Sequence, residues 1–354
     1  MALPPFLLNL TEWLRSQTQM SAELAGIVLG AGGLLAVLLV LWVGRWVVRS
    51  LNIVASAIST KSKARKAATG YRVLIAPPTG AGRSAFKFLL GAADERVSPF
   101  SFDAPIQVVS TAKIIGGRDA QSEKVARKRL KRANADMIVW GERVGRGVDG
   151  LNIFSLSRAG GLTADEAVLQ HFALPSSAKH RDDSVQQVTG YLLAKRLQPS
   201  LGRPTDFRAE RLLPVASQLS ELLETAKQLS PRVQHEVERD FSAAAIHVGE
   251  AEAEAVWLDK VITLRTETLS RLGNSPQPGI WAEAKLDLGR AMISKASMRF
   301  NPALVTEGSN HLREAIEVLK AEPMIRRAED AMGTLETARS LTANRNRFSI
   351  NFNG

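Results

Sequence analysis

The sequence contains no cysteine among its 354 residues. A chain without thiols cannot form a disulfide framework, use a cysteine nucleophile or hold a metal through cysteine. The absence is consistent with a reducing cytoplasm.

Motifs for catalysis and metal binding are also missing. The five histidines lack metal-ligand spacing, and His235-Glu236 starts a metalloprotease-like string in which Arg239 replaces the second ligand. The Gly-x-Ser-x-Gly elbow of serine hydrolases does not occur. We therefore expect a protein that is not an enzyme and uses no metal or cofactor, with each histidine at the surface or in the core.

A phosphate-binding loop is present only in altered form. The segment 77–84 (PPTGAGRS) follows a predicted strand, but Arg83 stands where phosphate loops need lysine, and Pro77 where they need the first glycine. These changes argue against nucleotide hydrolysis. Two interpretations remain: a plain glycine-rich loop, or weak anion binding by the backbone around Gly80, Gly82, Arg83 and Ser84.

Charged and strongly polar side chains are absent from Leu24–Val43 (LAGIVLGAGGLLAVLLVLWV). As a helix, this run covers about 30 Å, the thickness of the hydrocarbon core of a bilayer. It predicts a transmembrane helix over residues 24–44. Gly26 and Gly30 within it form a small-xxx-small pair through which two copies can pack as a homodimer.

Positive charge flanks this helix on one side. Arg15 is the one basic side chain before it, whereas Arg45, Arg49, Lys61, Lys63, Arg65 and Lys66 follow it. Short basic loops stay cytoplasmic, so the pattern predicts a single-pass protein of the bacterial inner membrane with its N-terminus outside. A cleaved signal peptide, the alternative, requires basic residues before the apolar run.

The net charge of +11 is unevenly distributed. Residues 1–69 carry 7 Lys and Arg against 2 Asp and Glu, and residues 70–200 carry 19 against 12. Residues 201–354 are balanced, at 20 against 21. Attraction to an anionic leaflet explains this distribution, so we expect the lipid bilayer as a partner and nucleic acid as the less favoured one.

Residues 70–200 predict a small α/β domain. β-rich runs cover 72–76, 106–110, 137–141 and 151–156, with an edge strand within 166–174 and a closing helix at 183–197. A further helix at 121–133 carries Lys124, Lys128 and Lys131 at helical spacing. These lysines form either a solvated face or a surface that meets anionic lipid.

Beyond Pro199 and Pro204 the pattern becomes helical. Amphipathic segments are predicted at 207–229, 231–272 with a break near Gly249, 280–299, 309–321 and 324–342. The predicted organisation is an interfacial segment (1–23), a transmembrane helix (24–44), a basic tether (45–69), an α/β domain (70–200), a linker (201–206), a helical domain (207–343) and a tail (344–354).

The α/β domain resembles the TolB-amino-terminal-like domain found beside tetratricopeptide arrays in bacterial proteins. The family has a strand ending in proline, a strand before a helix, Ala-Asp before a hydrophobic strand and glycine, and an antiparallel strand. These features correspond here to Val73–Pro77, Ile106–Thr111, Ala135–Glu142 and Leu151–Leu156. At Pro78-Thr79-Gly80 the family has phenylalanine and a polar residue instead. The resemblance implies no catalytic site.

The helical domain resembles tetratricopeptide (TPR) repeats. Leu288-Gly289 matches the Leu-Gly pair of the first repeat helix, and Ala315 and Leu319 match two apolar positions of the second. The resemblance implies a TPR-like α-solenoid, a superhelical stack of helix pairs whose groove binds a protein. Trp281 either packs in the core of this solenoid or faces its groove.

The predicted fold class is therefore a single N-terminal transmembrane helix, a small α/β domain and an all-α solenoid. The predicted function is a membrane-tethered cytoplasmic scaffold or adaptor that recruits an unknown protein partner through its helical repeats. The alternative is a signalling protein whose α/β domain binds a small anionic or nucleotide ligand without hydrolysis.

Overall fold

The computed structural model describes residues 70–144, 150–174, 183–225, 229–273 and 277–350, with Leu39 and Trp42; for 344–350 it describes the backbone alone. Contacts divide the chain after residue 60, and the second unit, Lys61–Gly354, contains all the elements below.

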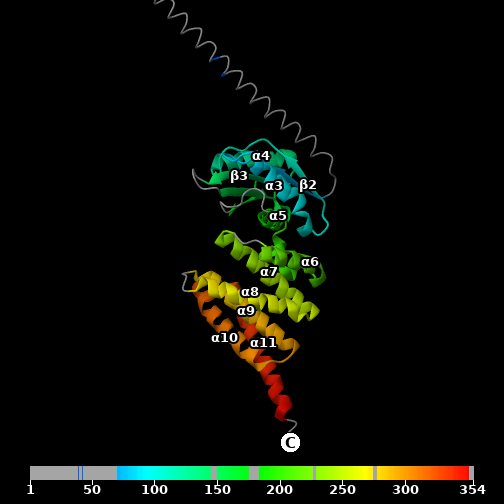
Figure 1. Cartoon of the computed structure of the whole chain (residues 1–354), viewed down its shortest axis with the longest axis vertical. Coiled ribbons are helices and arrows are strands. Elements are labelled where there is room, and N and C mark those ends of the chain that lie inside the picture. Colours follow the sequence, from blue (N-terminus) through cyan, green and yellow to red (C-terminus); the bar gives the residue numbers. More distant parts are fainter. Residues whose placement is uncertain are drawn as a thin grey trace, which may run out of the picture. The chain divides into compact units, whose positions relative to one another are not determined.

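A five-stranded mixed sheet forms the first part of this unit (Figure 1). Its strand order is β2-β1-β3-β4-β5, with β1 parallel to β2 and β3, and with β3, β4 and β5 successively antiparallel. The strands are β1 (Tyr71–Ile75), β2 (Ile106–Ser110), β3 (Met137–Val144), β4 (Gly150–Ser157) and β5 (Val168–Leu174). Strands thus occur at all five predicted positions, and β5 is an edge of the sheet.

Alternating side chains of the strands build two hydrophobic clusters. Val73 and Ile75 of β1 join the cluster on one face of the sheet, and Leu74 joins the cluster on the other. This two-residue period is what a sheet covered on both faces requires. The covering helices are α3 (Arg83–Glu95) and α5 (Asp183–Leu197) on the first face and α4 (Ala120–Ala133) on the second.

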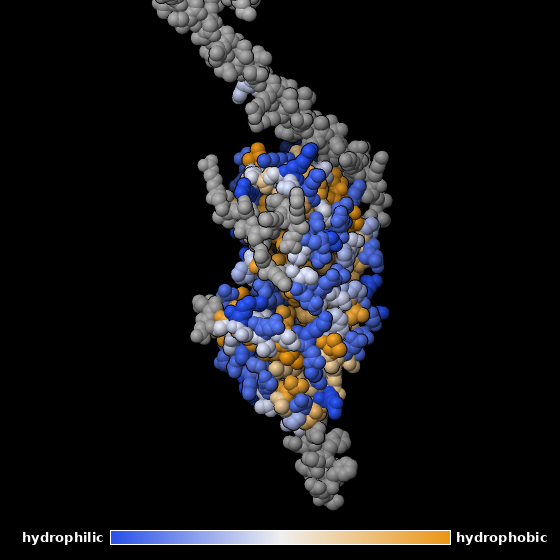
Figure 2. All heavy atoms as spheres, viewed as in Figure 1, coloured by the Kyte–Doolittle hydropathy of each residue, from blue (hydrophilic) through white to orange (hydrophobic). Residues whose placement is uncertain are grey.

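In the described ranges six helices follow α5, each packed on the next. They are α6 (Ala209–Thr225), α7 (Pro231–Glu252), α8 (Ala255–Leu272), α9 (Pro278–Met298), α10 (Pro302–Ala321) and α11 (Ile325–Ile350). In the view of Figure 2 their outward faces are mostly hydrophilic, with hydrophobic residues in small groups. Two short 3₁₀ turns, Pro199–Gly202 and Pro204–Asp206, connect α5 to α6.

The core on the α5 face of the sheet continues into the helices. Its members extend from Val73 in β1 through Tyr191 in α5 to Phe241 in α7 and Val261 in α8. Leu201, in the predicted linker, is buried in the same core. A separate cluster fills the space between α9, α10 and α11. The sheet and helices α5 to α8 thus share one core.

Several helix boundaries differ from the sequence pattern, among them the end of α11, which continues to Ile350 although the sequence predicts an end at 342 and a tail from 344. α10 begins at Pro302 rather than at 309, because proline fits the first turn of a helix, where its missing N–H costs no hydrogen bond. The Asn301 side chain caps this end by accepting hydrogen bonds from the N–H groups of Ala303 and Leu304. The break predicted near Gly249 occurs at Ala253, whose φ is 54°.

The tetratricopeptide interpretation is wrong. α9 and α10 contain 21 and 20 residues, so the two helices alone are longer than a complete repeat of about 34 residues. The match at Leu288-Gly289 is explained by the close contact of Gly289 in α9 with α10, and it does not require a repeat. The scaffold function that depended on a repeat groove loses its basis with the repeat.

The membrane prediction is also corrected. Within the ranges that the structure describes, no helix combines the length and the apolar character needed to cross a bilayer. These helices keep a polar side because they bury only part of their surface. The fold observed is a mixed sheet with nine helices over this part of the chain, so the predicted transmembrane fold class and the single-pass inner-membrane location are not supported.

Several predictions concern residues outside those described. They are the interfacial segment 1–23, the span 24–44 with Gly26 and Gly30, and the tether 45–69, of which only Leu39 and Trp42 are described.

Candidate functional site

The loop predicted to bind anions lies between β1 and α3. Gly80 has a φ of +73°, Gly82 directly precedes α3, and Arg83 and Ser84 are exposed in its first turn. Thr79 holds the loop in place, because its hydroxyl donates to the Ile114 carbonyl at 2.7 Å. The loop has the predicted position, with Arg83 as its single basic residue.

The three predicted basic residues of α4 are exposed along that helix. Lys131 pairs with Asp165 at 3.1 Å, and both side chains are exposed, so this pair contributes little to stability. Lys124 and Lys128 extend along the same side. The predicted contact with a lipid leaflet depended on the membrane prediction, which is not supported. We therefore interpret these lysines as a solvent-exposed face of α4.

The residues assigned to repeat packing belong to α9 and α10. Leu288, Gly289, Ala315 and Leu319 are buried. Trp281 is half-buried against the α9–α11 cluster, with the Lys285 ammonium 5.2 Å from its ring centroid. These residues build a helix interface rather than a ligand site.

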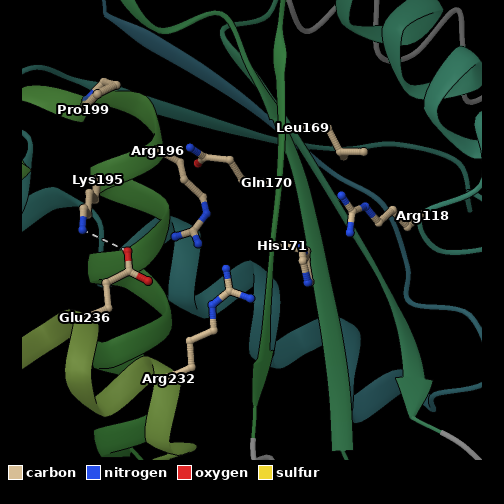
Figure 3. A pocket seen from close by; sticks show the side chains of 9 residues that line it. All are labelled: Arg118, Leu169, Gln170, His171, Lys195, Arg196, Pro199, Arg232 and Glu236. Atoms are coloured by element: carbon tan, nitrogen blue, oxygen red, sulfur yellow. Dashed lines mark hydrogen bonds and ion pairs between the residues drawn. The ribbon is translucent and has the colours of Figure 1, made fainter. Parts of the chain in front are cut away.

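A pocket of about 380 Å³ lies elsewhere, where strand β5 meets α5 and the start of α7 (Figure 3). Its lining combines four cationic side chains with one carboxylate, a histidine, an amide and two apolar residues. The members are Arg118, Lys195, Arg196, Arg232, Glu236, His171, Gln170, Leu169 and Pro199. The pocket is therefore strongly basic.

Arg196 is the most deeply buried of these cations, with 7% of its surface exposed. Its guanidinium lies 4.6 Å above the centroid of the Phe172 ring, and Nη1 donates to the Leu192 carbonyl at 2.6 Å. Its Nε is buried and has no hydrogen-bond partner in the structure described. Burial lowers the pKa of Arg196, although an arginine stays protonated in proteins. The site thus holds a buried cation with an unused donor.

Arg118 and Arg232 approach from two other elements. Arg118 lies in the turn before α4, a turn fixed by the Trp140 indole, which donates to the Gly117 carbonyl at 3.1 Å. Arg232 lies in the first turn of α7, where the positive end of the helix dipole makes a cation unfavourable. No carboxylate in the described ranges forms an ion pair with either side chain.

His171, on β5, lies among these arginines. Burial is the largest cause that lowers the pKa of His171, and the positive charges of Arg232, Arg118 and Arg196 lower it further. The imidazole is therefore neutral at pH 7. The ring also stacks on Phe154 at a centroid distance of 6.2 Å. All three guanidinium groups line the same pocket as this imidazole.

A partly buried ionic network supports the pocket from the α5–α7 side. Lys195 pairs with Glu236 at 2.9 Å and with Asp240 at 2.5 Å, and the Tyr191 hydroxyl donates to Asp240 at 2.8 Å. Burial by itself would raise the pKa of Glu236, but the positive charges of Lys195 and Arg196 outweigh this effect and lower it. Glu236, the one carboxylate of the lining, is therefore ionised and already occupied by Lys195.

This arrangement is suited to binding anions. Guanidinium groups bind carboxylate and phosphate oxygens through paired N–H donors. Three of them converge here while the nearby carboxylate is engaged by Lys195. An anionic ligand would neutralise the resulting positive potential.

Sequence reasoning did not identify these residues. The basic excess of residues 70–200 includes Arg118 and Arg196, which are far apart in the chain, and Arg232 lies outside that range. One local signal existed: Val185, Val188 and Leu192 form the inward stripe of the predicted closing helix, and Arg196 continues that stripe. An arginine at a position where the helical period demands burial marks a candidate site.

Comparison with protein-family models and with curated proteins finds no match. The resemblance to the TolB-amino-terminal-like domain therefore stays a prediction, and function has to be inferred from the pocket itself.

Proposed function

We propose that the protein binds a small ligand with anionic oxygen groups in the pocket at the edge of β5, and that it does so without hydrolysing the ligand. The observation that carries the proposal is the convergence of Arg118, Arg196 and Arg232, from three separate elements, on His171. This function corresponds to the alternative predicted from the sequence, a signalling protein that binds a small anionic ligand. The proposed site is the β5 pocket instead of the glycine-rich loop.

Binding without turnover agrees with the state of the one carboxylate in the lining. Glu236 is engaged by Lys195, which in turn also pairs with the buried Asp240. A general base has to be free to accept a proton from a nucleophile. The engaged groups instead hold the basic side chains in place.

The test is thermal unfolding of the full chain with phosphate, sulfate or citrate, at an ionic strength held constant with chloride. A ligand that binds only the native state stabilises it, by about 2.7 kcal/mol at a hundred times its Kd. We expect at least one of these anions to raise the Tm well beyond the effect of chloride.

Two arginine variants locate the site. Arg232→Gln removes an exposed pocket cation and should abolish most of the shift, whereas Arg83→Gln, in the glycine-rich loop, should leave it unchanged. If Arg83→Gln abolishes the shift and Arg232→Gln does not, the anion binds at the loop. If no anion stabilises the chain more than chloride, the proposal is wrong.

A further inference from the structure

The pocket runs over the edge of a strand rather than along a face of the sheet. Leu169, Gln170 and His171 are consecutive, and all three line it. Consecutive side chains of a strand point to opposite faces. Only a cavity that passes around the outer edge of β5 can meet all three.

The backbone of β5 also faces this cavity. Val139 of β3 accepts a hydrogen bond from the Ala76 N–H, so its polar groups face β1 and those of Trp140 face β4. The backbone N–H and C=O of Phe154, which is paired with Trp140, therefore point toward β3 and away from β5. His171 is opposite Phe154, and the two residues of an antiparallel pair either bond to each other or both face away. The N–H of His171 thus points outward from the edge.

The cations lie on both sides of this edge. Arg196 comes from α5, which covers one face of the sheet, and Arg118 comes from the turn that leads to α4, which covers the other. Figure 3 shows Arg196 with Gln170 on one side of β5, Arg118 with His171 on the other, and Arg232 reaching toward the strand from α7. The pocket therefore has two groups of cationic donors, with an outward backbone N–H between them.

Size and lining restrict the ligand further. A volume of about 380 Å³ falls in the lower part of the range of small-molecule sites, about 300–1,000 Å³. The lining contains no Trp, Tyr or Phe among the described residues, and the His171 ring is already stacked on Phe154. A nucleobase would thus find no aromatic surface to stack on, whereas a compact polyanion would meet cationic donors on both sides of β5.

We infer that the ligand carries two anionic groups a few atoms apart, as in a diphosphate or a short dicarboxylate, and that it straddles the edge of β5. One group binds Arg196 and Arg232, the other binds Arg118, and the His171 N–H donates to the ligand between them. This inference rests on the proposed function, because it specifies the ligand of the same pocket.

Titration calorimetry of the full chain tests the number of anionic groups. Pyrophosphate is compared with phosphate, and succinate with acetate, at equal ionic strength and without divalent cations. At least one two-headed anion should bind about a hundredfold more tightly than its single-headed counterpart, because it gains a second set of charge-assisted hydrogen bonds. The pair that shows this preference distinguishes phosphate from carboxylate chemistry.

Arg118→Gln provides the matched variant, because Arg118 is exposed and supports no core. It should remove most of the preference for the two-headed anion. The Kd of the single-headed anion should stay within about threefold of its value in the parent. Arg118→Lys, which keeps the charge, should restore part of the preference. An unchanged Tm of both unliganded variants shows that the fold is intact.

The outcomes separate the two proposals. If the two-headed and single-headed anions bind equally, or Arg118→Gln weakens both to the same degree, the straddling ligand is wrong and the anion site stands. If neither kind of anion binds, both proposals are wrong. If ADP binds more tightly than pyrophosphate, the site has a nucleobase pocket and the compact ligand inferred here is wrong.

Discussion

Lys195 forms an ion pair with the buried Asp240, with 2.5 Å between Nζ and Oδ2, that joins α5 to α7. Asp240 is 2% exposed and also accepts hydrogen bonds from Tyr191 and Arg239. Lys195 is adjacent to Arg196, and Asp240 lies two turns along α7 from Arg232. The pair thus fixes the spacing of two cations that belong to different elements.

Asp240→Ala should lower the free energy of unfolding by about 1–3 kcal/mol, because the buried Tyr191 hydroxyl loses its acceptor and Lys195 keeps Glu236 as its ionic partner. Urea denaturation of the full chain measures the change. Tyr191→Phe is the control, since it removes one hydrogen bond and keeps the ion pair, at a cost of about 1 kcal/mol. Equal costs for the two variants would show that the ion pair adds nothing to the hydrogen bond.

Binding of an anion should tighten as the pH falls from 7.5 to 6. Burial and three guanidinium charges lower the pKa of His171 in the unliganded protein. A bound anion offsets those charges, so the pKa rises on binding and the complex takes up a proton. Calorimetry at the two pH values should show a smaller Kd at pH 6 in the parent and little change in His171→Gln.

The same histidine has the opposite effect on the stability of the unliganded chain. Its folded-state pKa is below the unfolded value, so the unfolded chain binds the proton more readily. Its contribution to stability is complete above the unfolded pKa, about 6.5, and is lost as the pH falls toward the folded value. His171→Gln should therefore flatten the decline of unfolding free energy below pH 6.5. A parallel decline in parent and variant would contradict the assignment.

Gly289→Ala should destabilise the α9–α10 contact by about 1–3 kcal/mol. A Cβ at Gly289 would lie 2.7 Å from Leu312 Cγ and 2.8 Å from the carbonyl oxygen of Gly308, closer than the backbone can accommodate. Gly333→Ala in α11 is the matched control. Nothing lies within 4 Å of its added Cβ, so alanine should stabilise that helix by about 0.5–1 kcal/mol. Thermal unfolding should shift in opposite directions for the two variants.

Arg265→Met should cost about 3–5 kcal/mol, because the fully buried Arg265 is the ionic partner of Asp287, at 2.5 Å. Glu238, 4.0 Å from the same guanidinium, keeps Arg271 and Thr268 as partners. The double variant Arg265→Met with Asp287→Leu should therefore recover a large part of the loss. Additive costs in denaturant unfolding would contradict this coupling.

The sheet could be predicted from the sequence because its signal is local. Val73, Leu74 and Ile75 form a continuous apolar run typical of a strand buried on both faces, and the structure places them in two opposite clusters. The start of α10 could not be read the same way, because Pro302 is compatible with both a break and a first turn. The transmembrane prediction relied on the hydropathy of one segment, without information from any other part of the chain.

The anion pocket has no local signal of that kind. Arg118, His171 and Arg232 come together only because α7 packs on α5 and the turn before α4 reaches the edge of β5. Packing of this sort depends on contacts between residues far apart in the chain, and periodicity within one element does not encode them. Arg196 alone carries a local signal, as a charge that continues an apolar stripe, and the predictions from the sequence did not use it.

The hydrophobic core that joins the sheet to α6, α7 and α8 limits where the polypeptide can be cut. Protein ending near residue 200 would expose part of this core to water, because the buried side chains of α6, α7 and α8 that complete it would be missing. Exposed apolar patches of this kind promote self-association. Recombinant fragments intended to isolate the sheet should therefore extend through α8, to Leu272, and shorter ones are expected to precipitate.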